Sequence, residues 1–401
     1  MDFDDAPEDA AFRAEWRSWL IANADPAPAG FRGGFVAPGR EDPRVVDRAR
    51  DWQRRLAADG WGAIAWPKEH GGRAATPMQV YIHAQELAGF DVPPDIYSIG
   101  LGMIGPTLIA WGTEDQQRTH LPLMLDGSEI WCQMWSEPGA GSDIASLTTR
   151  GEYDADRDRW VLNGQKVWTS GAHRSRWGLV IVRTDPDGPK HRGLSAFILD
   201  MQAPGVDVRP LREMAGGRTF NEVFLTDVEV PAKNLVGPAG HGWAVALTTM
   251  AQERLTAGLI GLAAMPTEPL IGLARSAQRN GAPAIKDPVL RGRLIDVLVR
   301  HRVLELTSLR TLSAISRSGA PGPESSTLKL SWSNVGSSYA ELAVDLLGVE
   351  GTLTGPSAPY DGLVPAAWAF APSFHIGGGT DEVQRSVIGE QVLGLPKEPR
   401  P

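Results

Sequence analysis

The first part of the chain, residues 1–128, carries apolar residues at helical spacing. Phe12, Trp16 and Leu20 follow one another at intervals of four residues, which places them on one face of a helix. Proline and glycine clusters between residues 25 and 43 interrupt this pattern and indicate loops. The spacing therefore predicts an N-terminal helical domain over residues 1–128.

In the middle of the chain, residues 129–236, the hydrophobic period changes to two, which is typical of strands. The segment RWVLNGQKVW places Asn163 and Gly164 between two β-prone runs, and this arrangement predicts a hairpin with a type I′ turn. Further strands are expected in WGLVIVRTD, LSAFILDM and FNEVFLTDVEVP. The middle of the chain is therefore predicted to be a compact β domain.

The remainder, residues 237–401, returns to helical periodicity in long stretches that are rich in leucine and alanine. These stretches are interrupted near Pro266, Pro288 and Pro321, as in a bundle of helices. A helical domain, a β domain and a helical bundle, in this order, place the chain in the α+β class. The order is uncommon and narrows the candidate families.

Composition and charge argue against several classes of function. Of the 401 residues, 42% are hydrophobic and 22% are charged, which is typical of a globular protein. The net charge of -9 disfavours nonspecific nucleic-acid binding, since phosphate neutralisation needs clustered lysine and arginine. An acidic start and the lack of an apolar run of about 18 residues give no sign of a secretory signal or a membrane span. A single cysteine, Cys132, allows no internal disulfide and no Cys-His metal spacing, so a cytoplasmic protein without a metal is expected.

The segment WCQMWSEPGAGSD, residues 131–143, combines tryptophans and a carboxylate with a glycine-rich turn. Gly139 and Gly141 allow the backbone to come close to a ligand, and exposed N–H groups in such a turn can face anionic or carbonyl oxygens. The flat rings of Trp135 and Trp168 suit a planar cofactor, although they suit a hydrophobic core equally well. A lone Gly-x-Gly is more often an ordinary surface turn, so the segment needs support from elsewhere in the chain.

Three motifs in the right order and at the right distances give that support: WSEPGAGSDIASL, LNGQKVWTSGA and GGTDEVQRSVIGEQVLGLP. With them the chain resembles the acyl-CoA dehydrogenase family, and WPKEHGG and GTEDQQRTHLP extend the resemblance over the whole chain. The resemblance implies an N-terminal α-helical domain, a middle β-barrel-like domain and a C-terminal four-helix bundle. It also implies an FAD held at a subunit interface in a homotetramer or dimer.

The resemblance assigns cofactor contacts to residues of these motifs. The backbone from Gln133 to Ser136 would run along the pyrimidine side of the flavin, Trp168 would lie against the isoalloxazine ring, and Ser170 would hydrogen-bond near N5. The full set expected to bind FAD is Gln133, Met134, Trp135, Ser136, Gly141, Ser142, Trp168, Thr169, Ser170, Thr380 and Glu382. The last two would contact the nucleotide half of the cofactor.

The implied reaction removes an α-proton and a β-hydride from an acyl-CoA thioester, with N5 of FAD accepting the hydride. It requires a general base. In one branch of the family a glutamate stands directly before the Gly-Thr of the C-terminal motif, but this chain has Gly378 there. A second branch, which includes isovaleryl, long-chain and some steroid side-chain dehydrogenases, carries the base on a bundle helix, and Glu253 in LTTMAQERLTAG matches it. A flavin ribityl hydroxyl and the N–H of Gly378 would then polarise the thioester carbonyl.

Helical spacing supports Glu253 independently of the resemblance. Ala246, Met250, Glu253 and Ala257 follow one another at intervals of four, three and four residues, on one face. A carboxylate on an apolar face is costly unless it is used or paired. The alternative is a structural ion pair with Arg254 or with a distant arginine. If Glu253 is the base, loss of water when substrate enters would strengthen it.

The acyl end of the substrate is expected to border the loop IGGGT. Ser142, Gly377 and Gly379 are the expected substrate contacts, with Ser142 reaching either the FAD phosphates or the pantetheine arm. Gly377 and Gly378 stand where medium-chain relatives have a tyrosine and the base, so room for a branched or ring-bearing acyl group is predicted. The alternative is that the glycines only serve a tight turn. Glu137 is expected to be structural.

Four positions depart from the pattern with which the family grips FAD across a subunit interface. Ala277, Asn280, Pro288 and Asp345 stand where the family has arginine, phenylalanine and two glutamines. A carboxylate beside a pyrophosphate is electrostatically unfavourable. The departures predict a heterotetramer with a homologous subunit as an alternative to a homomer.

The function that the sequence favours is FAD-dependent oxidation of an acyl-CoA to the trans-2-enoyl-CoA, in fatty acid or steroid side-chain β-oxidation. An electron-transferring flavoprotein is the expected acceptor. Two alternatives stay open: a non-catalytic or half-site partner subunit of a heteromeric dehydrogenase, and a biosynthetic relative acting on another thioester. An NAD enzyme is disfavoured because the strand-GxGxxG-helix unit is missing from the sequence.

Overall fold

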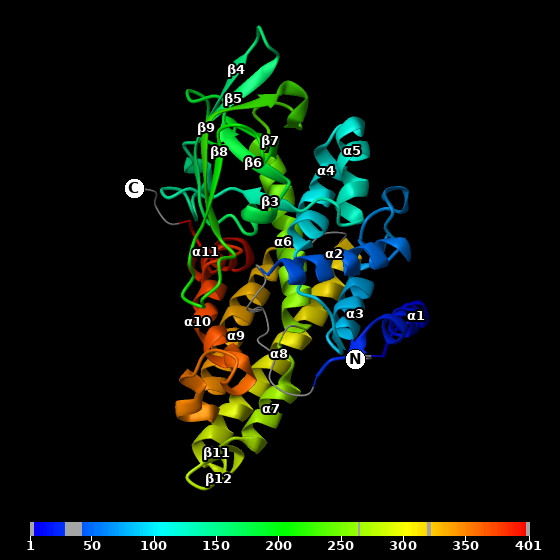
Figure 1. Cartoon of the computed structure of the whole chain (residues 1–401), viewed down its shortest axis with the longest axis vertical. Helices are drawn as coiled ribbons and strands as arrows, with labels where there is room; N and C mark the ends of the chain where they lie inside the picture. Colours follow the sequence, from blue (N-terminus) through cyan, green and yellow to red (C-terminus); the bar gives the residue numbers. More distant parts are fainter. Residues whose placement is uncertain (1–3, 29–41, 264, 319–321, 398–401) are drawn as a thin grey trace.

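The structure is a computed structural model that describes residues 4–28, 42–263, 265–318 and 322–397. A sheet lies at one end of the molecule, with short helices beside it, and the long helices α6, α8 and α9 extend from there to the other end (Figure 1). Helices before and after the sheet confirm the α+β class and the order of elements expected from the hydrophobic pattern.

The N-terminal helices are held together by large apolar side chains. Their bounds are α1 (Pro7–Asn23), α2 (Pro43–Ala58), α3 (Pro77–Leu87), α4 (Gly105–Trp111) and α5 (Glu114–Leu125). Helix α1 buries Phe12, Trp16 and Leu20, as their spacing predicts. Of the segment rich in proline and glycine between residues 25 and 43, residues 29–41 lie outside the described part of the chain. The short strand β1 (Asp25–Pro26) pairs with β2 (Phe90–Asp91).

The middle of the chain forms one curved sheet. Its strands are β3 (Trp131–Met134), β4 (Arg150–Asp154), β5 (Arg159–Lys166), β6 (Trp177–Arg183), β7 (Leu194–Asp200), β8 (Val206–Pro210), β9 (Asn221–Pro231) and β10 (Leu235–Val236). Their order is β10-β7-β6-β4-β5-β9-β8, and β3 adds to β6 in parallel. Apolar residues of β5, β6, β7 and β9 share one buried cluster, so the sheet curls around its own core.

The hairpin predicted at Asn163 and Gly164 is wrong. Both residues lie inside β5, which pairs with β4 on one side and β9 on the other, and the turn between β4 and β5 falls at residues 155–158. The Asn163 side chain instead joins β5 to β9, donating to Asp227 Oδ1 at 3.0 Å and accepting from the Asp227 N–H at 2.9 Å. Gly164 has φ +154°, and a Cβ there would lie 2.4 Å from Thr149 Oγ1, so close packing explains the glycine.

The C-terminal part is a bundle of helices. Its elements are α6 (Gly242–Ala263), α7 (Thr267–Ser276), β11 (Gln278–Arg279), β12 (Ala282–Pro283), α8 (Pro288–Ser318), α9 (Ser326–Leu347), α10 (Leu363–Phe370) and α11 (Asp381–Val387). The predicted interruptions at Pro266 and Pro288 are confirmed, since α7 begins one residue after Pro266 and α8 begins at Pro288. Pro321 lies outside the described residues. None of the helices in the described ranges is long and apolar enough to cross a membrane.

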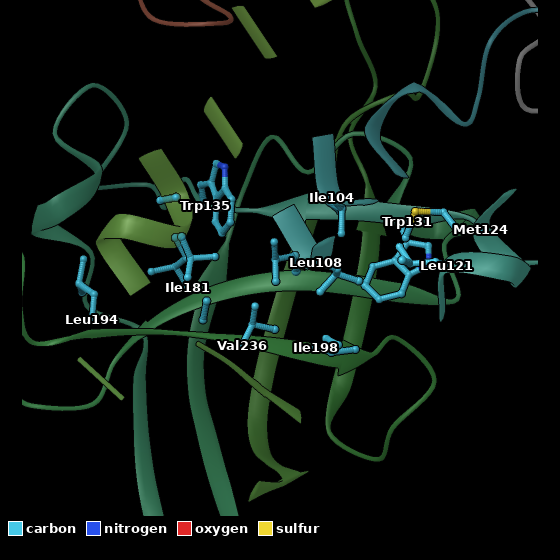
Figure 2. Packing of buried hydrophobic residues seen from close by; sticks show 14 of the residues in the cluster. Ile104, Leu108, Leu121, Met124, Trp131, Trp135, Ile181, Leu194, Ile198 and Val236 are labelled. Carbon is cyan, nitrogen blue, oxygen red and sulfur yellow. The ribbon is translucent and has the colours of Figure 1, made fainter. Parts of the chain in front are cut away.

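One buried cluster connects the three parts of the molecule. It contains side chains of α4, α5, β3, β6 and β7 together with Val245 and Ala246 of α6. Figure 2 shows Trp131 beside Leu121 and Met124 on one side of this cluster, with Trp135 and Ile181 on the other side. The start of α6 thereby packs against the sheet.

Candidate active site

Residues 133–142, from the segment WCQMWSEPGAGSD, and residues 166–170 lie side by side. These residues are called the cradle below. The Val167 N–H donates to the Ser136 carbonyl at 2.9 Å, which joins the end of β3 to the end of β5. The glycine-rich turn is closed by two backbone hydrogen bonds of 3.0 and 3.1 Å between Glu137 and Ala140. Two motifs that are separate in the sequence therefore form one surface.

A buried ion pair lies beneath the cradle. The Lys166 side chain is fully buried, and its Nζ donates to Glu137 Oε1 at 2.9 Å and to the Trp135 carbonyl at 3.1 Å. Glu137 also accepts from the backbone N–H groups of Thr148 at 2.7 Å and Thr149 at 2.9 Å. Burial opposes the charged form of Glu137, but Lys166 and these donors still lower the pKa of Glu137 to about 2. The carboxylate is used within the protein, which agrees with the structural role expected for it.

The cradle has hydrogen-bonding capacity that the protein itself does not use. Among the described residues, no hydrogen-bond partner is found for the buried atoms Gln133 Oε1, Trp135 Nε1 and Thr169 Oγ1. Buried polar atoms are nearly always paired, so three such atoms within the residues of the cradle leave donors and an acceptor that a polar ligand can use. A Cβ added at Gly139 or Gly141 would meet nothing within 4 Å, so the turn faces open space. The donor and acceptor set fits a polar, planar group such as the flavin of FAD.

Trp168 combines an exposed side chain with an unusual backbone conformation. Its side chain is 62% exposed, and its backbone has φ +60°, a strained value for a bulky residue. The neighbouring Thr169 fixes this conformation, because its N–H donates to the Asn221 carbonyl at 3.0 Å and its carbonyl accepts from Asn221 Nδ2 at 2.8 Å. Ser170 is half-buried beside it.

The other expected cofactor residues have different surroundings. Met134 is fully buried in the core of the sheet, so only its backbone can reach a ligand. Gly141 and Ser142 are exposed on the rim of the cradle. Thr380 caps α11 by accepting from the Val383 N–H at 3.3 Å, and the exposed Glu382 pairs with Arg385 at 3.3 Å. The roles of these residues stay predictions.

Glu253 and Gly378 meet in space although they are far apart in the sequence. A Cβ added at Gly378 would lie 3.7 Å from Glu253 Oε1, with no other heavy atom of the described residues within 4 Å. The carboxylate carried by α6 therefore occupies the place toward which a side chain at residue 378 would point. Ala246 lies in the buried cluster that also contains Trp135, and Met250 packs against this cluster, so the face of α6 that carries Glu253 begins in the core shared with the sheet. The side chain of Ala257 lies outside the described part.

The three glycines of the loop differ in what surrounds them. Gly378 and Gly379 have φ +70° and +88°, and a Cβ at Gly379 would lie 2.8 Å from Gln384 Nε2, so this glycine is needed for packing. At Gly377 the nearest atom to an added Cβ is the Ser373 carbonyl oxygen, at 3.6 Å. The positive φ of Gly378 fits a tight turn, whereas Gly377 has no such backbone requirement, and an added Cβ at either residue would meet a single atom of the described residues within 4 Å.

The four departures from the family pattern have local partners or local roles. Asp345 forms an ion pair with Arg293 of α8. Ala277 is the C-cap residue of α7, Asn280 has φ +50° in the turn between β11 and β12, and Pro288 begins α8. These residues are used within the chain.

Sequence reasoning missed two residues that shape the site, Lys166 and Gln384. Lys166 lies two positions beyond Gly164 on the inward side of β5, and a lysine at an inward strand position was the available signal. Gln384 is 1% exposed and donates from Nε2 to the Gly378 carbonyl at 3.0 Å. Only the tertiary structure reveals its contact with the loop.

Comparisons with known proteins agree with this architecture. Models of the acyl-CoA dehydrogenase N-terminal, middle and C-terminal domains match residues 7–128, 132–228 and 240–393. The chain is 40% identical over 389 residues to acyl-CoA dehydrogenase IpdE1 of Mycobacterium tuberculosis, covering 96% of this chain and 98% of that protein.

Two solved structures resemble this fold along the whole chain. The structure described as Tcur3481-Tcur3483 steroid ACAD has a TM-score of 0.83 at 27% identity and covers 99% of this chain and 100% of that chain. The ChsE4-ChsE5 complex from Mycobacterium tuberculosis has a TM-score of 0.80 at 30% identity, with coverage of 99% and 100%. The resemblance inferred from the motifs is confirmed, and the chain belongs to the acyl-CoA dehydrogenase family.

Proposed function

We propose that this protein catalyses FAD-dependent α,β-dehydrogenation of an acyl-CoA thioester to the trans-2-enoyl-CoA, with Glu253 as the general base. The observation that carries the proposal is the 3.7 Å distance between Glu253 Oε1 and the place of a Cβ at Gly378. It explains how a glutamate on α6 can replace a glutamate on the loop, because both would bring a carboxylate to the same point.

In this proposal Glu253 takes the α-proton of the substrate, which the thioester carbonyl makes acidic. The N–H of Gly378 donates to that carbonyl and stabilises the negative charge that develops on its oxygen. Gln384 holds the carbonyl of Gly378 at 3.0 Å and thereby restricts rotation of the adjoining peptide. Entry of the acyl chain removes water from Glu253 and strengthens it as a base.

FAD would be held by the cradle. The backbone from Gln133 to Ser136 would face the pyrimidine edge, Trp168 and Ser170 would lie at the ring near N5, and Thr380 and Glu382 would face the nucleotide half. Support comes from the buried polar atoms of the cradle that lack partners within the described residues. When bound, FAD supplies the two-electron acceptor that the β-hydride requires. Ser142 would then reach the FAD phosphates or the pantetheine arm.

We propose a branched or ring-bearing acyl group as the substrate, in steroid side-chain or fatty acid β-oxidation. Support comes from the open space in front of Gly377 and Gly378. A solved relative with a TM-score of 0.83 is described as a steroid ACAD. Gly377 and Gly379 would border the acyl chain.

We also propose assembly with a homologous, non-identical subunit. Two solved relatives carry the names of two different chains, Tcur3481-Tcur3483 and ChsE4-ChsE5. Asp345 stands where the family has a glutamine that contacts the FAD of the neighbouring subunit. In this chain Asp345 instead forms an ion pair with Arg293. Helix α8 also exposes an apolar stripe, with Ile295, Val299 and Val303 each more than half exposed at four-residue spacing. A protein that forms a homotetramer with one tightly bound FAD per chain would contradict this proposal.

The decisive experiment is anaerobic bleaching of the flavin. The FAD-loaded protein is mixed with short, branched, long and steroid-derived acyl-CoAs, and absorbance of the oxidised flavin is followed. Wild type should bleach with at least one class, whereas Glu253→Gln should bleach at least about 100-fold more slowly with its FAD retained. Glu341→Gln, at an exposed position of α9, is the matched control and should behave as wild type. Bleaching of Glu253→Gln within a few-fold of wild type would exclude Glu253 as the base.

The same experiment separates the alternatives. A purified protein that stays colourless even when FAD is supplied would favour a non-catalytic partner subunit. Hydrogen peroxide formed in air during turnover would favour an oxidase-type biosynthetic relative. Reoxidation of the bleached protein by an electron-transferring flavoprotein, without peroxide, would support the proposed acceptor.

A further inference from the structure

A chain of polar side chains ties the glycine loop to helix α9. His375, just before the loop, contacts Ser337 Oγ of α9 through Nε2 at 2.7 Å and Asp381 Oδ2 of α11 through Nδ1 at 2.7 Å. Lys329 of α9 donates from Nζ to the other Asp381 oxygen at 3.2 Å. Lys329, Ser337, His375 and Asp381 are called the clasp below.

One face of α9 is shaped to contact the residues around the glycine loop. Lys329, Ser333, Gly336 and Ser337 recur at intervals of four, three and one residues, so they share one helix face. Ser333 Oγ donates to the Phe374 carbonyl at 2.7 Å. At Gly336 an added Cβ would lie 2.8 Å from the Phe374 ring, so the missing side chain allows the loop to approach. Ser333, Gly336 and Ser337 contact the segment that leads into the glycine loop, and Lys329 contacts Asp381, which follows the loop.

The charges of the clasp are consistent with a fixed arrangement. Burial opposes the charged form of Asp381, but hydrogen bonds from His375 and Lys329 still lower the pKa of Asp381 below its ordinary value. Asp381 is therefore an anion that accepts from both sides, and Ser337 completes the hydrogen bonding of the imidazole. Side chains with every polar atom engaged hold a backbone more firmly than isolated contacts do.

The loop between the two ends of the clasp is the part that needs holding. Between His375 and Asp381 the chain contains three consecutive glycines, and these restrict the backbone least of all residues. Gly378, in the centre, faces Glu253. A shift of about 1 Å in a positioning group is enough to cost a large factor in rate. The glycines do not restrict the backbone of the loop, so the residues on either side of them must hold it in place.

We propose that His375 is a positioning residue, which joins Ser337 to Asp381 and so fixes the Gly378 N–H against the thioester carbonyl opposite Glu253. This inference rests on the proposed dehydrogenation. His375 touches neither the reacting carbons nor the flavin in this scheme. It acts through the loop.

The same three residues, Ser337, His375 and Asp381, have the hydrogen-bond order of a hydrolase triad. Ser337, however, lies in the middle of α9, where backbone N–H groups are used by the helix and cannot form an oxyanion hole beside it. The clasp interpretation is therefore favoured. Release of CoA thiol from acyl-CoA by wild type, lost in Ser337→Ala, would overturn it.

The test measures how well the site stabilises negative charge on a thioester. Acetoacetyl-CoA is added to the FAD-loaded protein at a series of pH values, and formation of its enolate is followed by the long-wavelength absorption of the enolate against oxidised flavin. In His375→Ala the pH at which half of the bound ligand is ionised should rise by about one unit, which is a tenfold loss of enolate stabilisation. The kcat for the best acyl-CoA should fall by about tenfold as well, with KM changing less than threefold. FAD content should stay at the wild-type level.

Further variants keep the result interpretable if His375→Ala folds poorly. Ser337→Ala and His375→Gln each leave part of the clasp, so each should give a smaller shift in the same direction. Asn334→Ala is the matched control, because Asn334 is exposed on the same helix and bonds only to the Leu330 carbonyl among the contacts found for it. Wild-type enolate formation and kcat in all three clasp variants would overturn the inference while leaving the proposed function intact. If the wild-type protein neither ionises the probe nor bleaches with any acyl-CoA, the proposed function and the inference both fail.

Discussion

The two halves of the site, the cradle and the glycine loop, are built in opposite ways. The cradle is held by a sheet, by backbone hydrogen bonds and by a fully buried ion pair between Lys166 and Glu137. The loop contains three consecutive glycines and is held from outside by side chains of α9 and α11. Under the proposed function the cradle holds the same cofactor in every turnover, whereas the loop borders the acyl end of the substrate and must leave room for it. The cradle is therefore held rigid by its own contacts, whereas the loop is held in place by side chains of neighbouring helices.

The cradle should respond most strongly to loss of one charge. Lys166→Met leaves Glu137 buried without its cation, so the free energy of unfolding should fall by about 3 to 5 kcal/mol and FAD content should fall with it. The double variant Glu137→Gln, Lys166→Met removes both charges and should regain more than half of the loss. Chemical denaturation and flavin absorbance measure the two effects. A single variant as stable as wild type would show that the pair does not hold the cradle together.

Acid should remove the contribution of Glu137 gradually. Its pKa is lowered to about 2 in the folded protein against 4.5 as the ordinary value, so the charged form stabilises the fold above pH 4.5. That stabilisation, about 3 kcal/mol, should be lost as the pH falls from 4.5 toward 2. Denaturation of wild type and Glu137→Gln across this range should therefore give curves that converge at low pH. If the free energies of unfolding of the two proteins instead change in parallel with pH, groups other than Glu137 cause the loss of stability in acid.

The loop, by contrast, should accept a transplanted base. Glu253→Gln should lower kcat by about 100-fold or more, and adding Gly378→Glu should restore about tenfold of it, because the Cβ of the new side chain would lie 3.7 Å from the place of Glu253 Oε1 and its carboxylate can reach the same region. Recovery stays partial, since a non-glycine residue at φ +70° is strained by about 1 to 2 kcal/mol. Anaerobic rates for wild type, the single variant and the double variant provide the comparison. If the double variant binds FAD but shows no recovery of rate, a carboxylate at residue 378 cannot reach the α-proton that Glu253 is proposed to take.

The sequence predicted those features that depend on local spacing or on whole motifs. The helix around Phe12 and Trp16 and the breaks at Pro266 and Pro288 follow from patterns within a few residues. The family follows from motifs that recur in a fixed order along the whole chain. The Asn163-Gly164 turn was mistaken because its local signal is overridden by pairing of β5 with β9, 64 residues away at Asp227. Propensity reports what a segment favours alone, and a central strand is decided by its neighbours.

The arrangement of the candidate site could be predicted only in part for the same reason. Motifs supplied Gln133, Trp168 and Glu253 as candidates, but they carry no information on which buried atoms lack partners. The ion pair of Lys166 with Glu137 and the contact of His375 with Ser337 join residues far apart in the chain. Such pairs depend on the packing of β3 against β5 and of α9 against the loop, which no short segment encodes.

The smallest expected effect concerns substrate choice, and it tests whether the open space at the loop is used. Gly377→Tyr fills the volume in front of a residue whose added Cβ meets only one atom, at 3.6 Å, so the fold should tolerate the change. If a bulky acyl group occupies this space, kcat/KM for branched or steroid-derived acyl-CoAs should fall by about tenfold or more relative to butyryl-CoA, which corresponds to roughly 1 to 3 kcal/mol of misfit. Cradle residues are untouched, so flavin content should be unchanged and serves as the control. Equal losses for short and bulky substrates would place the acyl group elsewhere, and the glycines would then serve only to bring the loop close to Glu253.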